Sequence, residues 1–144
     1  PAAYLNDNGM EEILQLRRMI EGPVCGEACR RASEEDVKEL EYFFKKMEAT
    51  KDYLPEFARF DYLFHIKMAR IAGNSIIMRI YDIMNEVMKC SFEKVVQARG
   101  NRAGLYYHGR IVDAFERKDD EAAEKIMDEH IKELYESFFN DFRD

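Results

Sequence analysis

Three histidines are the residues of this 144-residue chain whose types and spacing could do chemistry, and they are the only histidines it has: His65, His108 and His130. Asp61 precedes His65 by four residues, which places both side chains on one face of a helix. His108 and His130 each lie among apolar residues at helical spacing. We therefore expect all four side chains to point into a helical bundle, where burying them is costly unless they are paired or bound.

One divalent cation would satisfy these four groups together, through three imidazole nitrogens and a carboxylate oxygen. We therefore predict a metal site formed by Asp61, His65, His108 and His130, with room left for water or a ligand. The donor set suits zinc, nickel, manganese or iron, of which we favour zinc. The alternative is that the histidines are hydrogen-bonded separately to different partners in the core.

Motifs of known metalloenzymes are missing around these residues. The residues three positions before the histidines are Tyr62, Leu105 and Met127, so the Glu-x-x-His pairs of di-iron bundles are absent. His-Glu-x-x-His and glycine-rich phosphate loops are absent too, and nothing singles out a nucleophile. We predict a protein that is not an enzyme and has no catalytic residues. A helical-bundle metalloenzyme acting on a small organic acid, and a purely structural dimerisation module, remain as alternatives.

Two further polar residues are candidates for binding a small molecule. Arg17 lies on the inner side of the first expected helix, where it could clamp a carboxylate or simply pair with Glu21 four residues later. Asn85 borders an apolar arc and could donate a hydrogen bond to a ligand, although such residues often only edge a core. We predict both as effector-binding residues.

The elements that must position these residues are helices, because the apolar periodicity is helical nearly throughout. It predicts an all-α antiparallel bundle of about six helices. The second helix is expected from Ser33 to the connection at Asp52–Pro55, and the others to span about Gly9–Arg31, Pro55–Ala72, Ser75–Ala98, Arg102–Arg117 and Asp120–Phe139.

Local signals mark several ends of these helices. Pro23 predicts a kink or break in the first helix, because proline lacks the N–H that the helix needs. The sequence from Ser33 to Asp36 is typical of a helix start, and Gly73-Asn74 is typical of a helix end followed by a new cap. The helix from Ser75 is apolar over a wide arc, which predicts a central position in the bundle.

Composition limits the class of protein. A length of 144 residues with 47% hydrophobic residues predicts a single domain spanning 1–144 with a real core. The net charge of −7 argues against direct nucleic-acid binding by this chain. No stretch approaches the roughly 18 apolar residues of a membrane span. The three cysteines are expected to be reduced thiols in a cytoplasmic protein: Cys25, Cys29 and Cys90.

Several stretches, in order along essentially the whole chain, resemble a known family. They are Leu16–Glu21 with Ala28 and Arg31–Asp36, then Phe60–His65 with Ala72–Asn74, then His108, Ile111 and Ala114, and finally Asp119 or Asp120 with Ala123, Met127 and His130. Together they are similar to the FadR-type C-terminal (FCD) domain of GntR-family transcription regulators.

The resemblance implies an all-helical, effector-binding domain that is usually a homodimer. It implies that Asp61, His65, His108 and His130 hold one divalent metal, with the carboxylate of a small organic acid or sugar acid completing the coordination. It also matches Arg17 to a family arginine. A winged helix-turn-helix DNA-binding domain is expected before this domain in the full-length protein, and we expect DNA to be bound only through it.

Overall fold

The computed structural model describes residues 5–143, and over that range the chain forms helices and no strand. The seven helices in this range are α1 (Asp7–Arg31), α2 (Glu34–Ala49), α3 (Leu54–Ala72), α4 (Ser75–Ile83), α5 (Asn85–Arg99), α6 (Arg102–Glu116) and α7 (Asp120–Arg143). The all-α prediction is confirmed. The extra helix arises because the expected helix from Ser75 to Ala98 is two helices.

Helix ends follow the expected chemistry. Ser33 and Asp36 form a reciprocal capping box at the start of α2, with bonds of 3.1 and 3.0 Å between side chain and backbone. Gly73 ends α3 in the left-handed conformation, at φ 75°, which glycine adopts without strain. The Asn74 side chain then accepts from the first backbone N–H groups of α4 at 3.0 Å.

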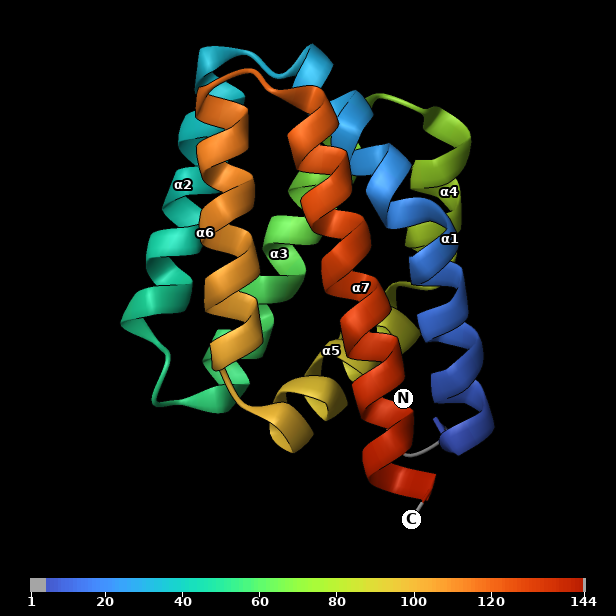
Figure 1. Ribbon diagram of the computed structural model, residues 1–144. Helices are drawn as coiled ribbons and strands as arrows, with labels where there is room; N and C mark the ends of the chain where they lie inside the picture. Colours follow the sequence, from blue (N-terminus) through green and yellow to red (C-terminus); the bar gives the residue numbers. More distant parts are fainter. Residues whose placement is uncertain (1–4, 144) are drawn as a thin grey trace.

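Pro23 lies inside α1, which continues through it to Arg31. Figure 1 shows α1 changing direction part of the way along its length. Proline removes the hydrogen bond to the carbonyl of Met19 and crowds the preceding turn, which accounts for a bend at this place. The helix is therefore kinked rather than broken.

The boundary between α4 and α5 corrects the sequence-based expectation. The chain leaves regular helix geometry at Met84, with φ −94° and ψ 7°, although neither glycine nor proline is present. The prediction that this segment is central to the bundle is also wrong for α4, where only Tyr81 is buried. Two isoleucines of the apolar arc that suggested a central helix, Ile76 and Ile80, face outward, and so does the neighbouring Ile83.

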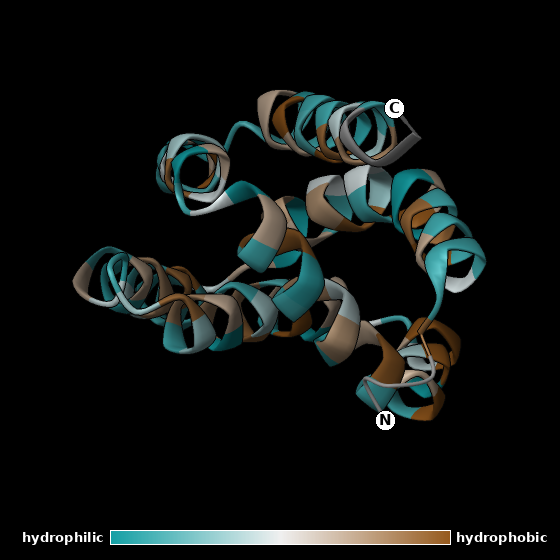
Figure 2. Cartoon of the chain, turned by 90° about the horizontal axis from the view of Figure 1, so that it is seen from below, coloured by the Kyte–Doolittle hydropathy of each residue, from teal (hydrophilic) through white to brown (hydrophobic). Residues whose placement is uncertain are grey.

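The central position belongs to α3, which packs against α1, α2 and α5. Helix α7 packs against α1 and α6. In Figure 1, α2 and α6 stand on the left and α1 on the right, with α3 behind and between them. Figure 2, seen from below, shows the helices arranged around a shared interior. This arrangement turns the inner faces of α3, α6 and α7 toward one another.

Candidate metal centre

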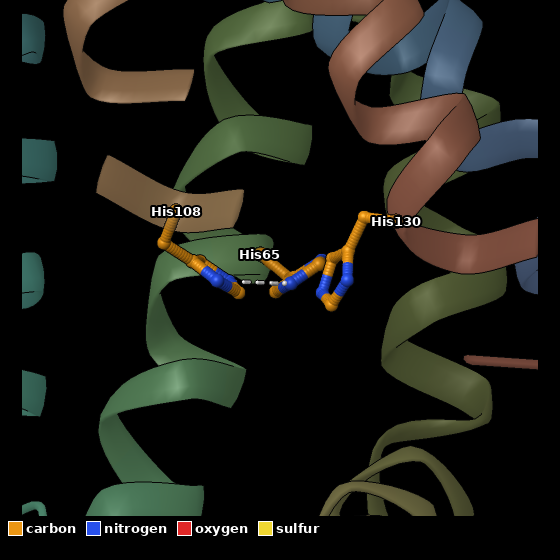
Figure 3. Close-up of side chains that lie close together, drawn as sticks. All are labelled: His65, His108 and His130. Carbon is orange, nitrogen blue, oxygen red and sulfur yellow. Dashed lines mark hydrogen bonds between the residues drawn. The ribbon is translucent and has the colours of Figure 1, made fainter. Parts of the chain in front are cut away.

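Three helices each bring one histidine to the same point in the interior. His65 comes from α3, His108 from α6 and His130 from α7, and their exposed fractions are 4%, 0% and 3%. One ring nitrogen of each lies within 4.8 Å of the others, and Figure 3 shows the three side chains converging. The prediction that all three histidines point into the bundle is confirmed, and together they form a buried group that could hold a metal ion.

Asp61 joins the two histidines that lie closest to each other. The Nε2 atoms of His65 and His108 are 2.9 Å apart. Asp61 Oδ1 is 3.0 Å from His108 Nε2 and 3.3 Å from His65 Nε2. This carboxylate oxygen is buried and makes no hydrogen bond of acceptable geometry. Asp61 Oδ1 and the Nε2 atoms of His65 and His108 are thus three potential ligand atoms that lie close together.

The Nδ1 atoms of His65 and His108 each lie beside a group that can only accept a hydrogen bond. His65 Nδ1 lies in very close contact with the carboxylate of Glu21, and His108 Nδ1 is 2.6 Å from the carbonyl of Gly104. Each Nδ1 must therefore carry its hydrogen and donate it. When both rings are neutral, their Nε2 lone pairs face each other and the Asp61 carboxylate. A cation between these atoms would remove the repulsion among them.

His130 completes the group from the opposite side. Its ring stacks on the ring of Tyr107, with centroids 4.6 Å apart and planes 26° apart. Tyr107 donates in turn to Glu133 at 2.5 Å, which holds the stacked ring in place. His130 Nδ1 is buried without a hydrogen-bond partner among the described residues, and such an orphan atom in a native core calls for a ligand or an ion.

The two carboxylates at the site are negatively charged at neutral pH, which favours a cation beside them. Burial would raise the pKa of Glu21, but Arg17 and His65 outweigh it and lower the pKa to about 2. Burial also opposes ionisation of Asp61, but its pKa is well below the usual value because His108 and His65 lie beside it. Both carboxylates are therefore ionised at neutral pH.

The histidines respond in opposite directions. Burial lowers the pKa of His130 well below its ordinary value, and the neighbouring histidines lower it further. Burial lowers the pKa of His65 as well, but Glu21 and Asp61 outweigh burial and raise it. His130 is therefore a neutral imidazole with a lone pair to give, while the surroundings of His65 attract positive charge.

Arg17 is 1% exposed and makes the internal pair that the sequence allowed. Its Nε donates to Glu21 Oε2 at 2.5 Å, and its guanidinium lies 4.0 Å from the centre of the Phe92 ring. Glu21 thus connects Arg17 to His65. The sequence signal for Glu21 was only its four-residue spacing from Arg17, because its contact with His65 spans 44 residues. Effector binding by Arg17 stays a prediction.

Asn85 lies at the start of α5 and contacts the site only through a neighbour. Its Oδ1 accepts a short hydrogen bond from the hydroxyl of Tyr62, the residue that follows Asp61. Its Nδ2 donates to Glu86 at 3.4 Å. Effector binding by Asn85 also stays a prediction.

The cysteines contribute no ligands to this centre. Cys25, Cys29 and Cys90 are buried and form no disulfide. Cys25 donates to the carbonyl of Ala123 at 3.4 Å.

Within residues 5–143, no helix has both the length and the apolar character needed to cross a membrane.

Comparison with known proteins identifies related chains. A family model described as the FCD domain matches residues 12–133. The curated HTH-type transcriptional repressor NanR of Enterobacter sp. (strain 638) is 29% identical over 132 residues, and that of Cronobacter sakazakii is 26% identical over 133. Each match covers 88% of this chain and 50% of the relative, so the chain spans about half the length of these relatives. Both names describe a repressor and neither describes an enzyme.

Solved structures share the fold. A Streptococcus agalactiae GntR structure superimposes with a TM-score of 0.73 at 22% identity, covering 93% of this chain and 62% of that one. The E. coli McbR/YncC structure gives a TM-score of 0.69 at 16% identity, covering 92% of this chain and 71% of that one. At these identities the likeness establishes the fold alone.

Proposed function

Because this chain belongs to the FCD domain family of GntR-type regulators, we propose that it is the sensor part of a transcriptional regulator. In this proposal it binds one divalent cation through Asp61, His65, His108 and His130. A small carboxylate effector completes the site and modulates DNA binding elsewhere in the protein. The observation that carries the proposal is the convergence of Asp61 Oδ1 with two Nε2 atoms whose rings already donate from Nδ1.

The distances among these atoms fit a shared metal ion. Two ligand atoms each about 2.1 Å from a metal are about 3.0 Å apart at a right angle and about 3.4 Å apart at a tetrahedral angle. The separations between Asp61, His65 and His108 are 2.9, 3.0 and 3.3 Å. The ligand nitrogen of His130 lies within 4.8 Å of the others, and in this proposal its ring moves inward when the metal binds. Nitrogen-rich ligands favour zinc, and nickel, manganese and iron also accept this set.

The charges favour an anionic effector. Asp61 and Glu21 supply two negative charges, while Arg17 and a divalent cation supply three positive charges, so one positive charge is in excess. A small organic acid or sugar acid would balance this excess, its carboxylate binding the metal as a Lewis acid. We place Arg17 and Asn85 at the effector end of the site, where Arg17 supplies charge and Asn85 a hydrogen bond.

The family supports a proposal about the partners. We propose that the chain acts as a homodimer and that it binds no DNA directly, consistent with its net charge of −7. DNA would be bound by an N-terminal winged helix-turn-helix domain of the full-length protein, since the curated relatives are named HTH-type repressors and are about twice as long. Such a regulator acts in the cytoplasm.

Thermal melting with a panel of small carboxylates tests the sensor proposal. We expect one class of carboxylate to raise the melting temperature of metal-loaded protein and to have little effect after chelation, because a ligand that binds only the folded state stabilises it. Asp61→Asn should remove the response, while Asp82→Asn, an exposed aspartate on α4, should retain it. An equal response with and without metal would contradict a metal-bound effector.

A further inference from the structure

His130 differs from the other two histidines in what orients its ring. The Nδ1 atoms of His65 and His108 lie beside the carboxylate of Glu21 and the carbonyl of Gly104, and hydrogen bonds of this kind fix the orientation of a metal-binding imidazole. His130 Nδ1 is buried without a hydrogen-bond partner among the described residues. The orientation of this ring therefore depends on packing rather than on a hydrogen bond at Nδ1.

The packing partner is Tyr107, the residue before His108 on α6. The rings of Tyr107 and His130 stack with their centroids 4.6 Å apart and their planes 26° apart. Stacked rings can slide past each other in their own planes, but tilting one of them separates the two faces and loses contact area. A metal ion lies in the plane of the imidazole that binds it. Tyr107 therefore fixes the plane of the His130 ring while permitting movement within that plane, toward the other ligand atoms.

Tyr107 is anchored at its hydroxyl as well as by its ring. The hydroxyl donates to Glu133 Oε2 at 2.5 Å, and Glu133 Oε1 accepts from Arg99 Nη2 at 2.9 Å. Glu133 follows His130 by three residues on α7, so the stack and the hydrogen bond join α6 to the same turn of α7. Arg99 extends the anchor to the last turn of α5. The Tyr107 ring is thereby held in place relative to the turn that carries His130.

The stack should become stronger when His130 binds a cation. A metal-bound imidazole takes on part of the positive charge of the ion, and the face of a tyrosine ring attracts positive charge. Tyr107 therefore stabilises the metal-bound form of His130 more than the free form. An interaction that differs between two states in this way shifts the equilibrium toward the state that it favours.

We infer that Tyr107 is a positioning residue for the metal centre and raises its metal affinity by orienting His130, through the stacked ring and the hydrogen bond to Glu133. This inference rests on the metal site in the proposed function. It adds a residue that acts on the metal only through His130.

Competition titration of zinc into chelator-treated protein tests this role. We expect Tyr107→Leu to lower the zinc affinity about 10- to 100-fold, as when other partners that orient a metal-binding histidine are lost. Tyr107→Phe keeps the stack and loses only the hydrogen bond to Glu133, so its affinity should fall about two- to tenfold. Tyr135→Leu is the matched control and should bind zinc like wild type. Tyr135 is also a half-buried tyrosine, but it packs on Phe139 and donates to Glu11 at 3.3 Å.

A double-mutant cycle separates action through His130 from a general structural role. In a His130→Ala background, Tyr107→Leu should lower the zinc affinity no further, because the ring that Tyr107 orients is gone. The absorption spectrum of cobalt-substituted protein reports the number and geometry of the ligands. It should change in Tyr107→Leu and stay as in wild type in Tyr135→Leu.

Metal binding by wild type separates this inference from the proposed function. Wild-type protein that binds neither zinc nor cobalt would overturn both. If wild type binds zinc, an unchanged affinity in folded Tyr107→Leu, or a further loss in the His130→Ala background, would overturn the positioning role alone. Should Tyr107→Leu not fold, Tyr107→Phe decides, since a fall in its affinity supports the role and an unchanged affinity overturns it.

Discussion

At the scale of single residues, Glu21 decides which nitrogen of His65 is available for a metal. Its carboxylate accepts the Nδ1 hydrogen and so directs the Nε2 lone pair toward His108 and Asp61. Such carboxylate partners orient metal-binding histidines and make them stronger ligands. Arg17 holds Glu21 in place from its other oxygen.

Glu21→Gln should weaken metal binding about 10- to 100-fold without abolishing it, because His65 loses the charged partner that orients it. Titration of the metal into chelator-treated protein measures the affinity. Glu12→Gln is the control, since Glu12 is exposed on the same helix. Unchanged affinity in Glu21→Gln would show that Glu21 serves only to neutralise Arg17.

Metal-free protein should lose stability in acid as Glu21 is protonated. Arg17 and His65 lower the pKa of Glu21 from its ordinary 4.5 to about 2, so the folded state binds this proton less readily than the unfolded state. Its contribution, on the order of 3 kcal/mol, is complete above pH 4.5 and is lost between pH 4.5 and 2. Urea unfolding of wild type and Glu21→Gln across this range measures the contribution. Their difference should shrink as the pH falls, and a constant difference would count against the ion pair.

The inward position of Asp61 and of the three histidines could be predicted from the sequence, because each lies on an apolar helix face. Asp61 and His65 are four residues apart and therefore share one face of a helix. The apolar neighbours of His108 and His130 indicated that both of these side chains point inward. Glu21 could not be recognised in this role, because its contact with His65 joins α1 to α3. Local periodicity shows which face of a helix is inside and does not show which residues of other helices it meets.

At the scale of elements, helix ends with strong local chemistry could be predicted and the boundary at Met84 could not. The capping box at Ser33 and the left-handed Gly73 depend on contacts within a few residues. Met84 leaves helix geometry without a glycine or proline to mark it. The bend there lets α5 pack against α3 while α4 keeps an exposed face, which is a property of the assembled bundle.

The apolar arc of α4 also shows why hydrophobicity alone misplaced a helix. The side chains of Ile76 and Ile83 resemble core residues by type, yet they are 70% and 84% exposed. The central helix is instead α3, whose inward face carries Asp61 and His65.

At the scale of the whole molecule, the fold gathers candidate ligands that are far apart in the sequence. His65, His108 and His130 come from three helices separated by turns and by α4 and α5, so the site exists only in the folded bundle. A metal bound there links α3, α6 and α7 directly and should stabilise the folded chain by linkage. Occupancy of the centre would thereby be coupled to the positions of the helices around it.

Elemental analysis of protein purified without added metal tests the central claim most directly. The account predicts close to one divalent metal ion per chain in wild type, and a large loss of that metal in folded His108→Ala and in folded His130→Ala. Wild-type metal content in both variants, or metal-free wild type that takes up none when divalent metals are supplied, would contradict it.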